Sequence, residues 1–212
     1  MVKRVLCYGN SNTWGYIPGT GERLDYDSRW TGILARLLEK EYQIIEEGLN
    51  GRTIAWDDPT HPGRNGMKYL LPCLETHRPL DMVIVLLGTN DLKNYFHGSV
   101  QDIVINMEKM IRLIKEVQYS FNGIPPQILL LSIPYVLKDN LPNSPFQNTR
   151  DKSIQLASEY QRVALKHRCH FLDISSTVKT SSTDGVHLNQ ENHQILAQLL
   201  IQKIKEIDKN LS

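Results

Sequence analysis

The sequence has little of several features that mark particular classes of protein. Its 212 residues include 24 basic and 23 acidic side chains, a formal net charge of +1, so the basic footprint of a nucleic-acid-binding protein is missing. The longest apolar run, residues 82–87, is far too short to span a membrane. The first residues show no long apolar region and no small-residue cleavage site, which predicts no signal peptide. We therefore expect a cytoplasmic protein with neither nucleic acid nor a membrane as a partner.

Cysteine is also scarce, with three residues in the whole chain: Cys7, Cys73 and Cys169. Their number is odd and their spacing is unlike that of a metal site. Cys7 and Cys169 lie in or beside apolar runs and are expected to be reduced core residues. Five histidines likewise show no metal-like spacing: His61, His77, His97, His167 and His170. A metal site is therefore not predicted.

Two motifs of common enzyme classes are absent. No Gly-x-Ser-x-Gly elbow occurs, which argues against an α/β-hydrolase. Residues 19–24 resemble the start of a dinucleotide fingerprint, but the third glycine is missing and the segment does not open a helix after a strand.

What the sequence does contain is an alternation of short apolar runs and amphipathic segments. The β-rich runs span residues 3–8, 42–46, 82–86, 127–133 and 170–172. Helical periodicity covers residues 30–38, 67–77 (the weakest), 103–117, 149–167 and 190–207. This alternation predicts parallel strands with right-handed crossovers. We expect one domain over residues 1–212, a three-layer α/β/α (flavodoxin-like) fold with a five-stranded parallel sheet.

Three stretches lack clear periodicity: residues 16–27, 55–65 and 135–147. Long loops in a compact domain are often functional. These lie at or near the carboxyl ends of predicted strands, so we expect them to rim a site there.

Ser11 lies just beyond the first apolar run, in the segment Gly-Asn-Ser-Asn-Thr (9–13). Ligands of open α/β sheets bind beyond the carboxyl ends of the strands, so a hydroxyl here is a candidate nucleophile. Small polar residues also end strands simply by making turns. By itself, Ser11 fits either interpretation.

A second candidate is the pair Asp184 and His187, which precedes the last amphipathic segment. An Asp three residues before a His, in a loop with a glycine, can bring its carboxylate to Nδ1 of the imidazole. That contact fixes the tautomer and leaves Nε2 free to act as a base. The alternative is an ordinary polar turn with a surface histidine.

Two more candidates follow predicted strands. Asn90, in the segment Leu-Gly-Thr-Asn-Asp (87–91), carries a side-chain NH₂ that could stabilise a developing oxyanion. Gly51 follows the second strand, where a glycine lets the backbone approach a ligand closely. Each is also compatible with a simple turn. Together with Ser11 and the Asp–His pair, they predict a nucleophile, a base with its orienting acid, and oxyanion donors on one edge of the sheet.

In their order along the chain, the segments around Ser11, Gly51, Asn90 and the Asp184–His187 pair resemble the four sequence blocks of the SGNH, or GDSL, hydrolase superfamily. Further segments resemble its arylesterase and acyltransferase branch. Those segments are Gly-Asn-Ser-Asn-Thr-Trp-Gly (9–15), Arg-Trp-Thr-Gly (29–32), Glu-Glu-Gly-Leu-Asn-Gly-Arg-Thr (46–53), Asp-Asp-Pro-Thr (57–60) and Leu-Gly-Thr-Asn-Asp (87–91). The resemblance covers most of the chain and weakens between about residues 120 and 180.

The resemblance implies a role for each candidate. Ser11 would be the nucleophile and His187 the general base, with Asp184 orienting it. The backbone N–H groups of Ser11 and Gly51 and the side chain of Asn90 would form the oxyanion hole. The resemblance also implies no metal or organic cofactor, and it is compatible with a homo-oligomer because the branch is often oligomeric.

One position departs from the family pattern: Asn10 stands where the family usually has Asp. That Asp organises the turn under the nucleophile and is not the triad acid. Asn keeps a carbonyl acceptor but loses the charge. We expect the turn to be retained, with altered activity or substrate preference.

Aromatic residues near these blocks are candidate substrate contacts. Tyr95 and Phe96 follow Asn90 and are expected to flank an acyl or aromatic group. Trp14 either lines the pocket or packs the first helix, whereas packing is expected for Trp30. His193 is expected on the solvent face of the last helix.

The sequence leads to two hypotheses. The first is a serine esterase that hydrolyses, or transfers, small acyl groups of carboxylic esters through an acyl-enzyme on Ser11. The second is a non-catalytic protein that binds a carbohydrate or lipid, for which Asn10 is the only support. The natural ester is not readable from the sequence: acetyl esters, aryl esters and acetylated sugars all remain.

Overall fold

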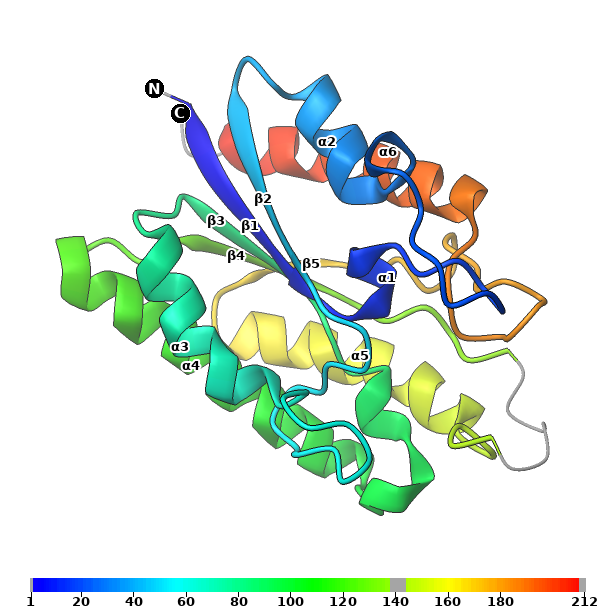
Figure 1. Cartoon of the computed structure of the whole chain (residues 1–212). Coiled ribbons are helices and arrows are strands. Elements are labelled where there is room, and N and C mark those ends of the chain that lie inside the picture. The colour runs from blue at the N-terminus through cyan, green and yellow to red at the C-terminus, as the bar shows by residue number, and fades with distance from the viewer. Residues whose placement is uncertain (1, 138–143, 210–212) are drawn as a thin grey trace.

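The computed structural model describes residues 2–137 and 144–209, and it shows a parallel sheet between two layers of helices (Figure 1). The strand order is β2-β1-β3-β4-β5, and every neighbouring pair is parallel. The strands are β1 (Lys3–Gly9), β2 (Tyr42–Gly48), β3 (Met82–Leu86), β4 (Gln127–Leu131) and β5 (His170–Leu172). This confirms the expected five-stranded α/β/α fold.

Six α-helices and three short 3₁₀ helices occur in the described residues. The α-helices are α1 (Ser11–Trp14), α2 (Trp30–Leu37), α3 (Gly66–His77), α4 (Val100–Asn122), α5 (Arg150–Lys166) and α6 (Gln190–Lys209). The 3₁₀ helices are η1 (Tyr26–Ser28), η2 (Asn90–Leu92) and η3 (Asn94–Phe96). Helices α2 and α6 cover one face of the sheet, and α3, α4 and α5 cover the other (Figure 1). None of these helices is long and apolar enough to cross a membrane.

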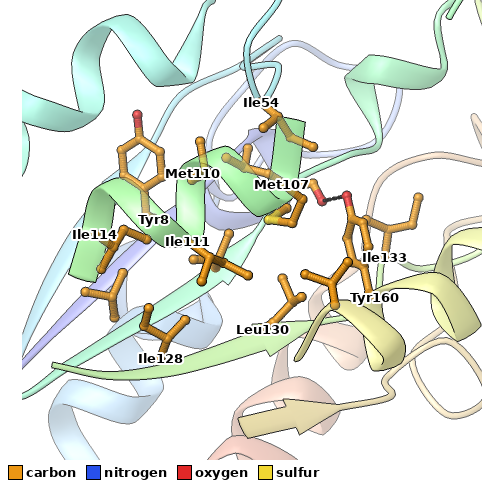
Figure 2. Close-up of a cluster of buried hydrophobic side chains, with 14 of the residues drawn as sticks. Tyr8, Ile54, Met107, Met110, Ile111, Ile114, Ile128, Leu130, Ile133 and Tyr160 are labelled. Carbon is orange, nitrogen blue, oxygen red and sulfur yellow. Dashed lines mark hydrogen bonds between the residues drawn. The ribbon is translucent and has the colours of Figure 1, made fainter. Parts of the chain in front are cut away.

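The core has two layers because successive side chains of a strand point to opposite faces. In β1, Leu6 and Tyr8 pack toward α3 and α4, whereas Val5 and Cys7 pack toward α2 and α6. Figure 2 shows the first layer, where side chains of α4 meet those of the strands. The buried hydroxyl of Tyr160 on α5 is satisfied by donating to the Leu87 carbonyl at 3.1 Å.

The candidate site lies where the direction of strand addition reverses. From β1 the chain adds β2 on one side, and then β3, β4 and β5 on the other. The crossover helices therefore diverge at the carboxyl ends of β1 and β3, which leaves a crevice at that edge. Ser11 follows β1 and Asn90 follows β3, so the topology brings these two segments together.

The sequence-based expectation for His193 was wrong. His193 is fully buried, and its Nδ1 accepts a hydrogen bond from the Trp30 amide at 3.3 Å. Its helical face also carries Leu196, Ala197 and Leu200, all buried, and this face packs on α2. Burial and the charge of Arg29 lower the pKa of His193 to about 4, so the ring is neutral at physiological pH.

Other differences are small. Helix α4 extends beyond the predicted range at both ends, and β4 ends at Leu131 instead of residue 133. The short helix α1 was not predicted, because four residues show no periodicity. The predicted loop 135–147 lies in part outside the described residues. All three cysteines are free, and Trp30 is buried as expected.

Candidate active site

Ser11 begins α1 directly after β1. Asn10 caps this helix, its side-chain oxygen accepting from the Asn12 amide at 3.0 Å. Gly48 of β2 permits the close packing of α1, because a Cβ at this position would lie 2.3 Å from the Trp14 nitrogen. The first amides of a helix have no partner within the helix. Ser11 thus combines a hydroxyl with a backbone N–H available at a helix start.

The predicted triad residues lie together. Ser11 Oγ is 3.0 Å from His187 Nε2, and His187 Nδ1 is 2.8 Å from Asp184 Oδ2. The second carboxylate oxygen of Asp184 accepts the amides of Val186 and His187, both at 3.0 Å. Burial opposes ionisation of Asp184, but these bonds outweigh it and hold its pKa below the usual value. The carboxylate is therefore charged at neutral pH and fixes the imidazole with Nε2 toward the serine.

Two residues of this region make contacts that were not predicted from the sequence. Asn12 joins α1 to the loop before α6, because its amide donates to the Val186 carbonyl at 3.3 Å and its oxygen accepts from the Leu188 amide at 3.0 Å. Tyr16 stacks on the ring of His187, with centroids 4.2 Å apart. Tyr16 opens one of the aperiodic loops, but a lone aromatic residue in a loop carries no separate signal.

Two of the predicted oxyanion donors lie on segments after β2 and β3: Gly51 is partly buried, and Asn90 is buried. The Asn90 amide donates to the Arg52 carbonyl at 3.1 Å, which leaves its second N–H for another acceptor. Gly51 has a φ of 77°, in the region that favours glycine. The Arg52 guanidinium in turn donates to the Gly9 carbonyl at 3.0 Å, so the segment after β2 is tied both to β1 and to Asn90.

Asp91 is a third residue of this region whose contact was not predicted from the sequence. Both carboxylate oxygens accept from the Ile54 amide, at 3.0 and 3.1 Å. The side chain is fully buried, and burial raises its pKa to about 7 despite the hydrogen bond from Ile54. Asp91 thereby holds the segment that carries Gly51 against the segment that carries Asn90.

The aromatic candidates for substrate contact lie against neighbouring side chains. The Tyr95 hydroxyl donates to Asp58 at 2.8 Å, and Phe96 packs on Trp56 with ring centroids 5.1 Å apart. Trp14 ends α1, and the guanidinium of Arg23 lies 4.9 Å from its ring. Tyr95 and Phe96 thus lie on η3 and contact the loop after β2, whereas Trp14 lies on α1 with Ser11.

The arrangement is suited to nucleophilic attack on an electrophilic carbon. A serine hydroxyl is a weak nucleophile at neutral pH unless a neighbouring base removes its proton. Here the imidazole lies within hydrogen-bond reach of the hydroxyl and is oriented by a carboxylate. Donors from the segments after β2 and β3 lie at the same edge of the sheet, where they can stabilise negative charge on the attacked group.

The chain is similar to known proteins in sequence and in fold. The model of the GDSL-like lipase/acylhydrolase family matches residues 7–195, whereas no curated protein matches the chain. An aryl esterase of M. smegmatis is 37% identical, with a TM-score of 0.91 over 97% of this chain and 99% of that one. A carbohydrate acetylesterase of Sinorhizobium meliloti is 34% identical, with a TM-score of 0.90 over 97% and 99%.

A third structure, a lipase/acylhydrolase of Enterococcus faecalis, shares the fold at 21% identity, with a TM-score of 0.73 over 97% of this chain and 96% of that one. The family model covers nearly the whole chain, and the first two structures match it at more than 30% identity over almost their full length. This chain therefore belongs to the GDSL-like lipase/acylhydrolase family.

Proposed function

We propose that this protein is a serine esterase, with Ser11 as nucleophile, His187 as general base and Asp184 as the residue that orients it. Ser11 Oγ attacks the ester carbonyl while His187 Nε2 takes its proton. The Ser11 and Gly51 amides and the Asn90 side chain hold the oxyanion. His187 then protonates the leaving alcohol, and water or a second alcohol releases the acyl group.

The observation that carries this proposal is the continuous contact from Ser11 Oγ through His187 to Asp184, at 3.0 and 2.8 Å. Family membership supports ester chemistry for such a contact. The similar solved structures include an aryl esterase and a carbohydrate acetylesterase, so we propose small acyl groups, acetyl foremost, on aryl or sugar alcohols. Trp14, Tyr95 and Phe96 are the proposed substrate contacts.

Labelling with a fluorophosphonate tests the mechanism. The reagent should modify Ser11 in the folded protein, as located by peptide mass spectrometry. Ser11→Ala should abolish both labelling and hydrolysis of short-chain aryl esters, whereas the control Ser28→Ala should retain both. Absence of labelling in folded wild-type protein, or full activity of Ser11→Ala, would contradict the mechanism and favour a binding protein. A panel of esters that varies acyl length and alcohol would then identify the substrate class.

We also propose a cytoplasmic location and a homo-oligomer. The free cysteines, two of them buried, support a reducing compartment. The resemblance to an often oligomeric branch supports self-association. Light scattering of the purified protein tests the oligomer, and fractionation of cells tests the location.

A further inference from the structure

Two consecutive glutamates, Glu46 and Glu47, precede the last residue of β2. They meet different partners because they point to opposite faces of the sheet. Glu46 is paired with two arginines, Arg23 and Arg29, and accepts a hydrogen bond from Thr31. Glu47 points toward α3 instead, where its side chain meets an imidazole and a thiol. Glu46 is thus a structural ion pair, whereas the neighbours of Glu47 have a different chemistry.

The neighbours of Glu47 are Cys73 and His77, which are four residues apart and therefore lie on one face of α3. His77 Nε2 is 3.0 Å from Glu47 Oε1. One donor atom from each of the three residues lies within 4.8 Å of the other two. Cys73 is buried, and the side chains of Glu47 and His77 are 19% and 25% exposed.

A thiol, an imidazole and a carboxylate are the side chains that bind zinc. The metal–ligand distances are about 2.3 Å to sulfur and about 2.0–2.2 Å to nitrogen or oxygen. Donors around one zinc ion therefore lie within about 4 Å of one another, so small side-chain rotations would close this cluster around a cation. Three protein ligands leave a fourth position for water, as in many zinc sites.

A positive charge and a pocket lie beside the cluster. The charge would repel a cation, and the pocket would let one enter. The guanidinium of Arg52 lies over the rings of Tyr8 and Tyr69, at 4.3 and 5.3 Å, and donates to the backbone carbonyls of Gly9 and Glu47. The Tyr69 hydroxyl is 3.4 Å from Glu47 Oε1. A pocket of about 570 Å³, lined by Glu47, Arg52, Lys68 and Tyr69 among others, opens beside the cluster.

The thiol carries a proton in the absence of a cation. Burial, followed by the charge of Glu47, raises the pKa of Cys73 to about 12, and Arg52 only partly offsets this. A bound metal must displace that proton. The repulsion from Arg52 and this proton displacement both reduce the affinity that the three ligands alone would give.

We propose that Glu47, Cys73 and His77 form a binding site for a zinc-type divalent cation, which joins α3 to the edge strand β2. The site is separate from the ester chemistry and takes no part in its steps. This cluster was not predictable from spacing along the chain, because the carboxylate comes from a distant strand and only two of the ligands share a helix. An occupied site would fix the end of β2, from which the segment carrying Gly51 departs.

Cobalt(II) is a suitable probe because its bond to a thiolate gives a charge-transfer absorption that oxygen and nitrogen ligands do not produce. Chelator-treated wild-type protein should bind one equivalent of Co²⁺ with this absorption, and Zn²⁺ should displace it. Cys73→Ser should lose the absorption. The matched control Cys169→Ser, which replaces a partly buried free cysteine outside the cluster, should retain it.

A second variant covers the case in which Cys73→Ser fails to fold. His77→Gln alters a partly exposed side chain and should weaken Zn²⁺ binding more than tenfold in competition with a chromophoric chelator, with the circular dichroism spectrum unchanged. Saturation by zinc should raise the Tm of the wild type and not that of His77→Gln. The proposal is overturned if the wild type shows no stoichiometric binding or no thiolate absorption, or if His77→Gln binds Zn²⁺ as tightly as the wild type.

Discussion

The two halves of the candidate site are built in different ways. The half with Asp184 and His187 comes from one short loop, and its side chains are 25% and 19% exposed. The half with Gly51 and Asn90 joins two loops that are far apart in sequence, and Asn90 and Asp91 are almost fully buried. The first half is encoded locally, whereas the second depends on contacts such as that between Asp91 and Ile54.

The difference follows from what each half is proposed to do. A base that takes a proton from serine and returns it to a leaving group has to face the substrate. A donor that stabilises an oxyanion is more effective when it is held rigidly in a dry environment, because its dipole does not have to reorganise during the reaction. In this proposal the more exposed half transfers protons, and the half with Asn90, which we call the buried half, provides a fixed electrostatic environment.

Removing the charge of Asp184 should have the largest effect. Asp184→Asn keeps the shape but presents an amide to His187 Nδ1, which favours the wrong imidazole tautomer. We expect kcat on an aryl ester to fall by about 10⁴-fold, with KM little changed. A reduction of less than tenfold would show that His187 does not need this partner.

Removing the side-chain donor of the buried half should have a smaller effect. Asn90→Ala is expected to lower kcat by about 10²- to 10³-fold, because the Ser11 and Gly51 amides remain. Steady-state kinetics measure the loss, and circular dichroism checks that the fold is retained. A loss larger than that of Asp184→Asn would reverse the proposed ranking of the two halves.

The buried half should also make the stability of the protein depend on pH, through Asp91. Asp91 has a pKa of about 7 in the fold and about 3.9 when unfolded, so between these values only the folded state keeps the proton. The contribution of Asp91 to stability therefore falls as pH rises from about 4 to about 7, by at most about 4 kcal/mol, and is constant above. Asp91→Asn should remove this dependence.

The measurement for Asp91 is urea unfolding of both proteins between pH 4 and 8. Buried His193, with a pKa lowered to about 4, has the opposite trend but is present in both proteins, so the difference between them isolates Asp91. The stability of Asp91→Asn relative to wild type should increase up to about pH 7. A difference that is independent of pH would show that Asp91 is ionised throughout this range.

The smallest effect is expected at Asn10. Its oxygen accepts from the Asn12 amide, and Asp is an equally good cap, so Asn10→Asp should change kcat/KM less than tenfold. The Asn10 Nδ2 has no hydrogen-bond partner among the described residues, so its loss breaks no bond. Asn10→Ala, which removes the cap at a cost of about 1 kcal/mol, is the control. A change greater than tenfold in Asn10→Asp would show that this position tunes the nucleophile.

Much of the fold could be predicted because its signals are local. Hydrophobic periodicity indicated all five strands and the five long helices, and the alternation of strand and helix implied parallel pairing. The positions of Ser11, Gly51 and Asn90 after successive strands then implied a common edge. Residues whose environment comes from distant segments were not predictable. His193 was misplaced because its burial depends on α2. The contact of Tyr16 with His187 was not predicted because it depends on the loop before α6.

The sequence by itself determined the fold class and the residues available for ester chemistry, because both follow from local spacing. Only the tertiary structure decided how those residues are held. It joined Asn12, next to Ser11, to the loop that carries His187, buried Asp91 against Ile54, and brought Glu47 to Cys73 and His77. The physical reason is that hydrogen bonding, burial and metal coordination depend on distances through space, and spacing along a chain fixes such distances only within one element.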